Sequence, residues 1–488
     1  MSRRISWRCL LLMALASLAA CTHAPVVDRP AMLLANPQLM PALVPGSEGA
    51  HFEDGAWWRE IGGEPLHNLV EQGLRGNTDI AVALTRVREA RAGLRAREAA
   101  LLPSFGLNGA YDNKRSGLPQ AIKQGRPDTR VWQASLELDW EPDLFGRNQS
   151  AADAAQQDVL SSEAGVAGAR LMLISEVARQ FVLNVGAVRK LALLDHLIAL
   201  QAASQTLIEH QAREGEISAV QVEAGRAQLQ ELQAQRPALL SLQSVTRSHL
   251  ARLTSSTPEE VGRFLAQVND TTVPWHVPGP TPTGQPIELL ARRPDIIAAR
   301  ATWRAELARL DSANTDLLPR FFLSLLTGRQ DLRLNGLALA PVGFNETTLA
   351  FALPIFNAGR VQAGIDIQDA TAQRAELRYE QAIRQAADDV ESALAQFHQS
   401  RDRVNELDRA VEARKEAATR GQRLFDEGQI SALDRVALEQ AHVSSALNAI
   451  DSQESARLAL IQLHQALGGG WRSAPSHNLD IAQKEARP

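Results

Sequence analysis

Two stretches of alternating apolar and polar residues each lead directly into a long helical pattern. Alternation with a period of two residues predicts a strand with one apolar face, and it occurs at residues 131–140 and 347–353. The apolar positions are Trp132, Ala134, Leu136, Leu138 and Trp140 in the first stretch and Leu349, Phe351 and Leu353 in the second. Pro142 and Pro354 then end the strands, because proline has no backbone N–H for the ladder.

The pattern that follows Gly359 has the seven-residue spacing of a coiled coil. The apolar residues at this spacing are Ile383, Val390, Phe397, Val404 and Val411. No proline occurs between Pro354 and Pro475, so nothing in this stretch breaks a helix. A helix of roughly 65 residues would reach about 100 Å, which exceeds the width of an ordinary globular domain.

The second half of the chain repeats the first. Gly146 and Gly359 precede the two long helical patterns and are 213 positions apart, and the same offset relates Gly215 to Gly428. The segments 101–105 and 317–321, which read Leu-Leu-Pro-Ser-Phe and Leu-Leu-Pro-Arg-Phe, are 216 positions apart. Matches at several landmarks with two close offsets indicate a tandem duplication.

These landmarks divide the chain into six predicted segments. They are a signal peptide at 1–20, a lipidated N-terminal tether at 21–56, a first repeat at 57–253 with strands at about 104–112 and 131–141, a Pro/Gly-rich linker at 254–286, a second repeat at 287–472 with strands at about 321–329 and 347–354, and a C-terminal tail at 473–488. In the first repeat, helices are expected from Pro65, and an irregular stretch is expected from Pro237 to Leu253. Each repeat therefore supplies one two-stranded hairpin and a set of helices.

The chain begins with a targeting segment. Arg3, Arg4 and Arg8 precede an apolar run that is too short to span a membrane as a mature helix and that ends in Leu-Ala-Ala before Cys21. Small residues before a cysteine resemble a bacterial lipobox, in which the cysteine is acylated and becomes the first residue. Thr22 follows where an Asp would favour inner-membrane retention, so sorting to the outer membrane is expected.

Composition narrows the class of protein further. The formal charge of −5 becomes −8 once the three leader arginines are removed, and the absence of a basic patch argues against nucleic acid as a partner. Cys21 is then the single mature cysteine, so no intrachain disulfide is expected. The sequence has no run of about 18 consecutive apolar residues, so no transmembrane helix is predicted. A crossing of the membrane would then have to use strands.

Four strands with apolar faces cannot close a barrel by themselves. An open strand edge in lipid leaves N–H and C=O groups unpaired, at a cost of several kcal/mol each. The strands therefore predict that several chains share one barrel, with eight strands from two chains or twelve from three. The alternative is an antiparallel sheet on a soluble core, which does not explain why both strands lead into such long helices.

Several motifs resemble those of the TolC/OprM outer-membrane efflux factors, with the lipoprotein (NodT-like) branch most similar. They are Leu-Leu-x-Arg-Arg-Pro-Asp-Ile at 289–296, Leu-Leu-Pro-Arg-Phe at 317–321, Pro-Ile-Phe-Asn-Ala-Gly-Arg at 354–360, Tyr-Glu-Gln-Ala-Ile-Arg-Gln-Ala at 379–386 and Ala-Leu-Gly-Gly-Gly-Trp at 466–471. The resemblance implies a mainly α-helical fold with a membrane β-hairpin pair, in which four strands per chain join a twelve-stranded barrel of a homotrimer above a coiled-coil tunnel. It also implies a periplasmic membrane-fusion adaptor and an inner-membrane pump, of the RND or another type, as partners.

The helix breaks at 213–218 and 426–431 are predicted to be periplasmic tips. Each break lies far along a long helix from its strand, so both project away from the membrane. The resemblance implies that a Gly-containing turn at this place contacts the adaptor. The contact residues predicted on this basis are Gly215, Ile217, Ser218, Gly428, Ile430 and Ser431.

The second tip is the more acidic one. Asp426 replaces Arg213 and Asp434 replaces Gln221 at equivalent positions. Rings of carboxylates in a pore select cations, so Asp426 and Asp434 are candidates for a cation-selective gate. The alternative is that Asp434 pairs with a helix neighbour and faces solvent.

No motif predicts catalysis, a cofactor or a metal site. The eleven histidines are scattered, and no His-Glu-x-x-His or paired cysteine occurs. Three functions remain: the passive exit duct of a tripartite efflux system for small molecules or drugs, the duct of a type I protein secretion system, and a structural periplasmic coiled-coil lipoprotein. The lipobox favours the first over the second, and the alternating strands argue against the third. The expected location is the outer membrane of a Gram-negative bacterium, with a lipid anchor and an extension into the periplasm.

Overall fold

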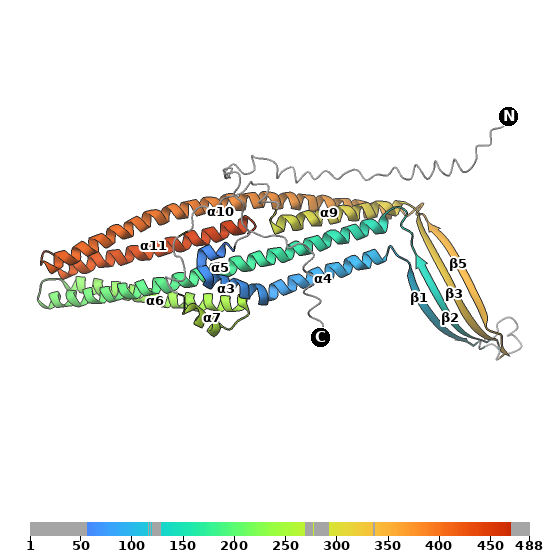
Figure 1. The fold of residues 1–488 in the computed structure, drawn as a ribbon, viewed down its shortest axis with the longest axis horizontal. Helices are drawn as coiled ribbons and strands as arrows, with labels where there is room; N and C mark the ends of the chain where they lie inside the picture. The colour runs from blue at the N-terminus through green and yellow to red at the C-terminus, as the bar shows by residue number, and fades with distance from the viewer. Residues whose placement is uncertain are drawn as a thin grey trace, which may run out of the picture.

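The computed structural model describes residues 56–115, 128–268, 292–334 and 337–469, together with 117, 119 and 277. This part of the chain is elongated, with a sheet at one end and long helices running to the other (Figure 1). The helices are α3 (Trp58–Gly76), α4 (Thr78–Ala99), α5 (Arg147–Arg213), α6 (Ala219–Thr254), α7 (Pro258–Leu265), α9 (Pro294–Asn314), α10 (Arg360–Asp426) and α11 (Ala432–Ala466), with a 3-10 turn at Thr315–Leu317.

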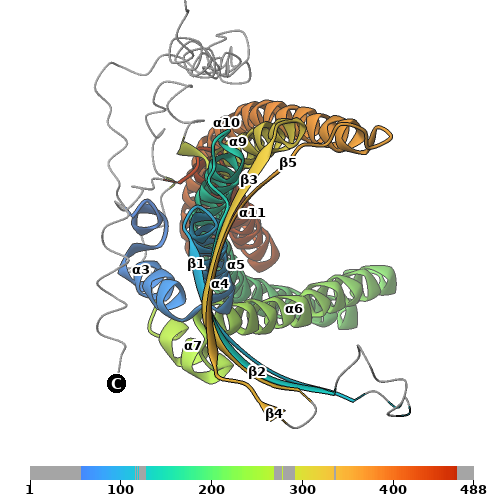
Figure 2. The same cartoon turned by 90° about the vertical axis from the view of Figure 1, so that its right-hand side faces the viewer.

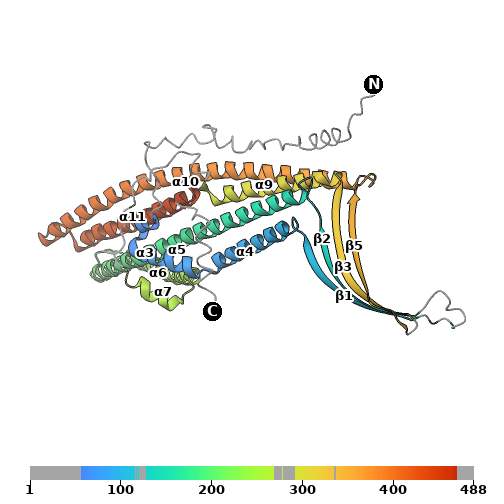
Figure 3. The ribbon, with the colours of Figure 1, turned by 45° about the vertical axis from the view of Figure 1, so that its right-hand side comes forward.

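The sheet is built from two hairpins, one from each repeat. Its strands are β1 (Ser104–Lys114), β2 (Thr129–Trp140), β3 (Arg320–Leu334), β4 (Leu337–Ala338) and β5 (Val342–Ala352). All pairs are antiparallel; β2 joins the repeats by pairing with β3, and β1 and β5 lie at the two edges. The strands curve away from the helix ends together (Figure 3).

The duplication extends to the strand register. In the first hairpin Leu107 lies opposite Leu136, and in the second Leu323 lies opposite Leu349. Adding 216 to 107 and 213 to 136 converts the first pair into the second, which are the two offsets of the sequence repeat. The repeats are therefore equivalent at the level of individual residue pairs in the sheet.

The two strand-to-helix connections have the same backbone geometry. Gly146 and Gly359 precede α5 and α10 with φ of 78° and 81°, a left-handed conformation that favours glycine. Each helix that follows is 67 residues long. In α10 the heptad positions 383, 390, 397 and 404 are buried, while Val411 is half-buried, so the predicted coiled-coil seam is confirmed over most of its length.

Several boundaries differ from the predicted ones. The strand expected at 347–354 runs instead over Val342–Ala352, because its ladder with β3 extends from Val342 opposite Gln330 to Ala352 opposite Arg320. The strand expected at 321–329 is longer for a related reason, since its ladder with β2 extends to Leu334 opposite Thr129. The other two strands match to within two residues.

One prediction about an irregular segment is wrong, and the predicted linker contains a short helix. The linker expected at 254–286 contains α7, which begins at a capping box between Thr257 and Glu260 with Pro258 at the first helical position. The stretch from Pro237 is not irregular, because α6 continues through it to Thr254. Pro237 is exposed, so water can solvate the carbonyl group that its missing N–H leaves unpaired.

The main core lies midway along the helices, where α3 packs against the bundle. Ile61, Leu66 and Val70 of α3 are fully buried and belong to one apolar cluster with Phe181 of α5 and Leu460 of α11. The helix starts at Trp58 rather than at the expected Pro65, with a kink at Gly63, whose φ is 63°. This cluster packs helices of both repeats against each other at a distance from the sheet.

In the part of the chain that the structure describes, one helix, α5, contains a window long and apolar enough to cross a membrane by length and composition. The window is 67% buried inside the protein. Side chains such as Val177, Phe181 and Val182 in this helix are inaccessible to solvent because neighbouring helices cover them. The apolar character of α5 is therefore explained by its place in the helical core.

Candidate functional site

The sheet has one apolar and one polar face. Phe105, Leu107, Tyr111, Trp132, Leu136, Leu349 and Phe351 alternate along their strands and are all at least half exposed. On the opposite face, Asn108 donates a hydrogen bond to Glu137 on the neighbouring strand at 2.5 Å. Exposed apolar side chains at alternate positions on long strands are typical of a sheet that faces lipid on one side and water on the other.

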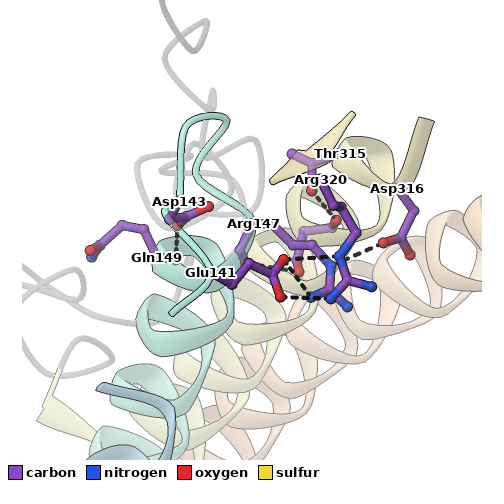
Figure 4. A network of polar contacts seen from close by, with 8 residues as sticks. Glu141, Asp143, Arg147, Gln149, Thr315, Asp316 and Arg320 are labelled. Atoms are coloured by element: carbon purple, nitrogen blue, oxygen red, sulfur yellow. Dashed lines mark hydrogen bonds and ion pairs between the residues drawn. The ribbon is translucent and has the colours of Figure 1, made fainter. Parts of the chain in front are cut away.

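A polar network fastens the strands to the helices (Figure 4). Arg320 at the start of β3 makes a bidentate contact with Glu141 just after β2, with N–O distances of 2.9 and 2.7 Å. Arg147 at the start of α5 lies 3.9 Å from Glu141 and donates to Asp316 at 3.0 Å. Hydrogen bonds from Arg320 hold the pKa of Glu141 below its ordinary value. The network therefore links the end of one repeat's hairpin to the start of the other's.

Both predicted tips lie at the end of the molecule opposite the sheet (Figure 1). Gly215 and Gly428 adopt φ of 83° and 73°, and each ends its helix in the same way. The N–H of Glu216 donates to the carbonyl of Gln211 at 3.0 Å, and the N–H of Gln429 donates to Leu424 at 2.8 Å. These are the long-range bonds of a Schellman turn, which requires a residue without strain in the left-handed region.

The next helix begins at a serine in each tip. The N–H of Ser218 donates to the Gln221 side chain at 3.1 Å, and that of Ser431 donates to Asp434 at the same distance. The backbone N–H of Asp434 donates in turn to the Ser431 hydroxyl at 3.1 Å. The hydrogen bonds from Ser431 lower the pKa of Asp434. The aligned Gln and Asp thus perform the same capping role with different charge.

The structure places the two gate candidates on the exposed surface of the single chain. Asp434 is held by its cap, which matches the alternative that it pairs with a helix neighbour. Asp426 is exposed and accepts a hydrogen bond from Gln422 at 2.8 Å. Arg435 reaches across the turn, with its guanidinium 3.2 Å from Gln422 and 5.3 Å from the Phe425 ring centre. Arg435 was not predicted from the sequence, because the helix pattern does not show which side chains meet across the turn.

The structure also brings together a charged cluster that sequence reasoning missed. Lys190 of α5 lies 3.0 Å from Asp451 and 3.1 Å from Glu454, both on α11. Burial raises the pKa of Glu454, an effect that the charge of Lys190 opposes. Gly186 leaves the space that Glu454 occupies. No sequence signal predicts this cluster, because the three charges come from different repeats.

Nothing in the described residues forms a group of three or more His, Cys, Asp or Glu side chains suited to a metal ion. Cys21, the predicted lipid anchor, lies outside the described residues. The remaining predicted site residues, Gly215, Ile217, Ser218, Gly428, Ile430 and Ser431, are all at the two tips, where the isoleucines are half-buried and the others exposed.

A sheet with a lipid-facing side, joined to a helical shaft of two 67-residue helices with paired turns at its far end, defines an outer-membrane duct. The chain belongs to the outer membrane efflux protein family, whose model matches residues 69–256 and 286–469. The two matched segments coincide with the two repeats. The protein is therefore an efflux channel of the outer membrane.

Relatives and solved structures match over nearly the whole chain. Outer membrane protein OprJ of Pseudomonas aeruginosa is 28% identical over 94% of this chain and 95% of its own length. Cation efflux system protein CusC of Escherichia coli is 26% identical over 93% and 97%. The structure of the outer-membrane channel OprN matches with a TM-score of 0.78 at 25% identity, covering 89% of this chain and 96% of that one. These matches confirm the predicted fold class, efflux function and outer-membrane location.

Proposed function

We propose that three copies of this chain form a passive exit duct that receives small molecules from a periplasmic adaptor and an inner-membrane pump. The observation that carries the proposal is the pair of free strand edges, β1 and β5, at the two sides of an open sheet. Figure 2 shows the chain as a curved shell that is open on one side. Three such shells supply twelve long strands and close both the sheet and the helical shaft.

The duct carries out no covalent chemistry in this proposal. Its plan is mechanical: an apolar belt in the membrane, a long helical wall and two turns at the far end. Energy for export is supplied by the pump, whose type is left open. CusC is named as a cation efflux protein, and the exposed carboxylates Asp426 and Asp434 at the second tip make cationic cargo the first to test.

The assembly is tested by native mass measurement in detergent. We expect three chains in the particle, and a well-behaved monomer would refute the shared sheet together with the duct.

The orientation is tested by cross-linking the tips to the adaptor. Ser218→Cys and Ser431→Cys variants, labelled with a short bifunctional reagent, are expected to capture the adaptor in cells. Tyr111→Cys on β1 is the matched control, since it lies at the opposite end of the molecule and is half exposed. Capture from Tyr111→Cys alone would reverse the proposed orientation.

A further inference from the structure

The two edge strands present free backbones of equal length. β1 and β5 have 11 residues each, and among the described strands each pairs on one side only. Both edges need partners in lipid, because unpaired N–H and C=O groups there are costly. We propose that β5 of one chain pairs antiparallel with β1 of a second copy, in a register that sets Leu349 opposite Tyr111 and Glu346 opposite Lys114. This inference rests on the proposed trimer and specifies how its chains join.

The register follows from the duplication. Every residue pair of the first hairpin becomes a pair of the second when 216 is added on the β1 side and 213 on the β2 side, as Leu107–Leu136 and Leu323–Leu349 show. The same offsets can be applied to the observed pairing of β2 with β3. Adding 213 converts a residue of β2 into its equivalent in β5, and subtracting 216 converts a residue of β3 into its equivalent in β1. The β2–β3 pairing therefore predicts how β5 of one copy pairs with β1 of another.

Two observed pairs define the new contact. Leu136 lies opposite Thr327; 136 + 213 is 349 and 327 − 216 is 111, which pairs Leu349 with Tyr111. Gln133 lies opposite Gln330; 133 + 213 is 346 and 330 − 216 is 114, which pairs Glu346 with Lys114. The contact then extends from Glu346–Lys114 to Ala352–Asn108 within the existing strands.

Charge complementarity supports this register over its neighbours. Glu346 and Lys114 were not used to derive it, yet the register sets these opposite charges directly across from each other, which stabilises a strand pair. A slip of two residues in one direction would set Glu346 opposite Asp112, a repulsive pair, and in the other direction opposite Ser116. Among the described residues of the single chain, Lys114 pairs with the exposed Asp112, at 3.6 Å.

The faces of the strands agree as well. The register places Phe351 opposite Gly109, so the apolar face of β5 continues the apolar face of β1. A slip of one residue would turn all apolar side chains of one strand to the polar face of the other. An aromatic ring beside a strand glycine also covers backbone that the glycine leaves exposed.

Engineered cysteines test the register directly. Ala350 and Ala110 are opposite each other in it, and cross-strand neighbours have the Cα separation that a disulfide needs. The full-length double variant Ala350→Cys with Ala110→Cys is expected to give covalently linked trimers on a non-reducing gel. The matched control, Ala350→Cys with Asn108→Cys, is two residues out of register and is expected to give little product.

Stronger linking in the control would overturn the register while leaving the trimer intact. Native mass measurement of the same variants separates this result from failure of the proposed function, because a monomer would remove both.

A charge exchange provides a second test that needs no cysteine. Glu346→Lys alone and Lys114→Glu alone each create a like-charge pair and are expected to lose heat-resistant trimer. The double exchange restores opposite charges and is expected to regain the trimer. A double exchange that is no better than the single ones would overturn the proposed pairing.

Discussion

Gly421 of α10 lies directly against Leu438 of α11, so that a Cβ built on Gly421 would collide with the Leu438 side chain. The equivalent residues of the first repeat are Ile208 and Gly225, since both pairs differ by 213 positions. There Gly225 is the small residue; a Cβ built on it would collide with Gln205 Oε1 and would lie in ordinary contact, 3.5 Å, with Ile208 Cδ1. The two helical hairpins thus pack at equivalent positions. The large side chain comes from the first helix, α5, in one hairpin and from the second helix, α11, in the other.

This reciprocal arrangement predicts a rescue. Gly421→Leu is expected to push α10 from α11 and to destabilise the second hairpin by about 1–3 kcal/mol, the usual cost of overpacking. Adding Leu438→Gly recreates the order of the first repeat and is expected to recover most of that loss. Limited proteolysis near the tip and denaturant unfolding report the change. Equal instability of the single and double variants would show that the two hairpins are not interchangeable.

Acid is expected to weaken the packing of Trp57, the residue just before α3, against the helical core. His464 stacks on Trp57 with 4.6 Å between ring centres, and burial lowers the pKa of His464 from 6.5 to about 4. Between pH 6.5 and about pH 4, His464 therefore binds a proton in the unfolded chain but not in the folded chain. The free energy of unfolding falls as the pH drops below 6.5, and the contribution of His464 is fully lost by about pH 4. The total loss is about 3 kcal/mol.

Unfolding at pH 7.5 and pH 5, followed by tryptophan fluorescence, measures this dependence. His464→Phe keeps the ring stacking and should flatten the pH profile. His210→Phe is the control, because the His210 side chain is 64% exposed and should leave the profile unchanged. An unaltered profile in His464→Phe would assign the acid sensitivity to other groups.

Cys21 is predicted to be the acylated first residue of the mature protein. The leader sequence carries this prediction. Mass spectrometry of the N-terminal peptide should find a lipid-modified cysteine, and an unmodified residue or cleavage elsewhere would refute it. Cys21→Ser is expected to assemble and remain in the membrane, because the strands hold it there without acyl chains.

The carboxylates of the second tip are predicted to make the periplasmic mouth cation-selective. Ser431 stabilises the ionised form of Asp434, so this group keeps its charge at pH values where an ordinary aspartate is protonated. In planar bilayers, Asp426→Asn with Asp434→Asn should lower the ratio of cation to anion permeability. Asparagine preserves the capping bonds, which keeps the test electrostatic.

Glu427→Gln serves as the control for this experiment, because it removes one charge at a position where the first tip also carries a glutamate, Glu214. Unchanged selectivity in the double aspartate variant would place Asp426 and Asp434 on the outer surface of the duct.

The periodic features of the sequence determine most of the fold. Period-two alternation located the strands around Leu136 and Leu349, and heptad spacing located the buried seam of α10. The duplication gave the positions of both tips. These features could be predicted because each depends on residues within one element or on an offset along the chain.

Contacts between repeats could not be predicted in this way. The pairing of Arg320 with Glu141 joins residues 179 positions apart, and Lys190 meets Glu454 only because α5 packs on α11. Neither periodicity nor composition specifies which helices become neighbours. The start of β5 was also missed, because its first residues gain a strand partner only when β3 extends beyond its apolar part.

The antiparallel contact between β2 and β3 has a consequence for the order in which the chain assembles. Each hairpin closes a short segment, whereas Trp140 and its partner Leu323 are 183 positions apart and are separated by α5, α6, α7 and α9. Chain entropy and contact order make such distant pairing the slow event. We therefore expect both hairpins to gain hydrogen-exchange protection before β2 and β3 protect each other in pulse-labelling experiments. Simultaneous protection would instead mean that the helices bring the two hairpins together first.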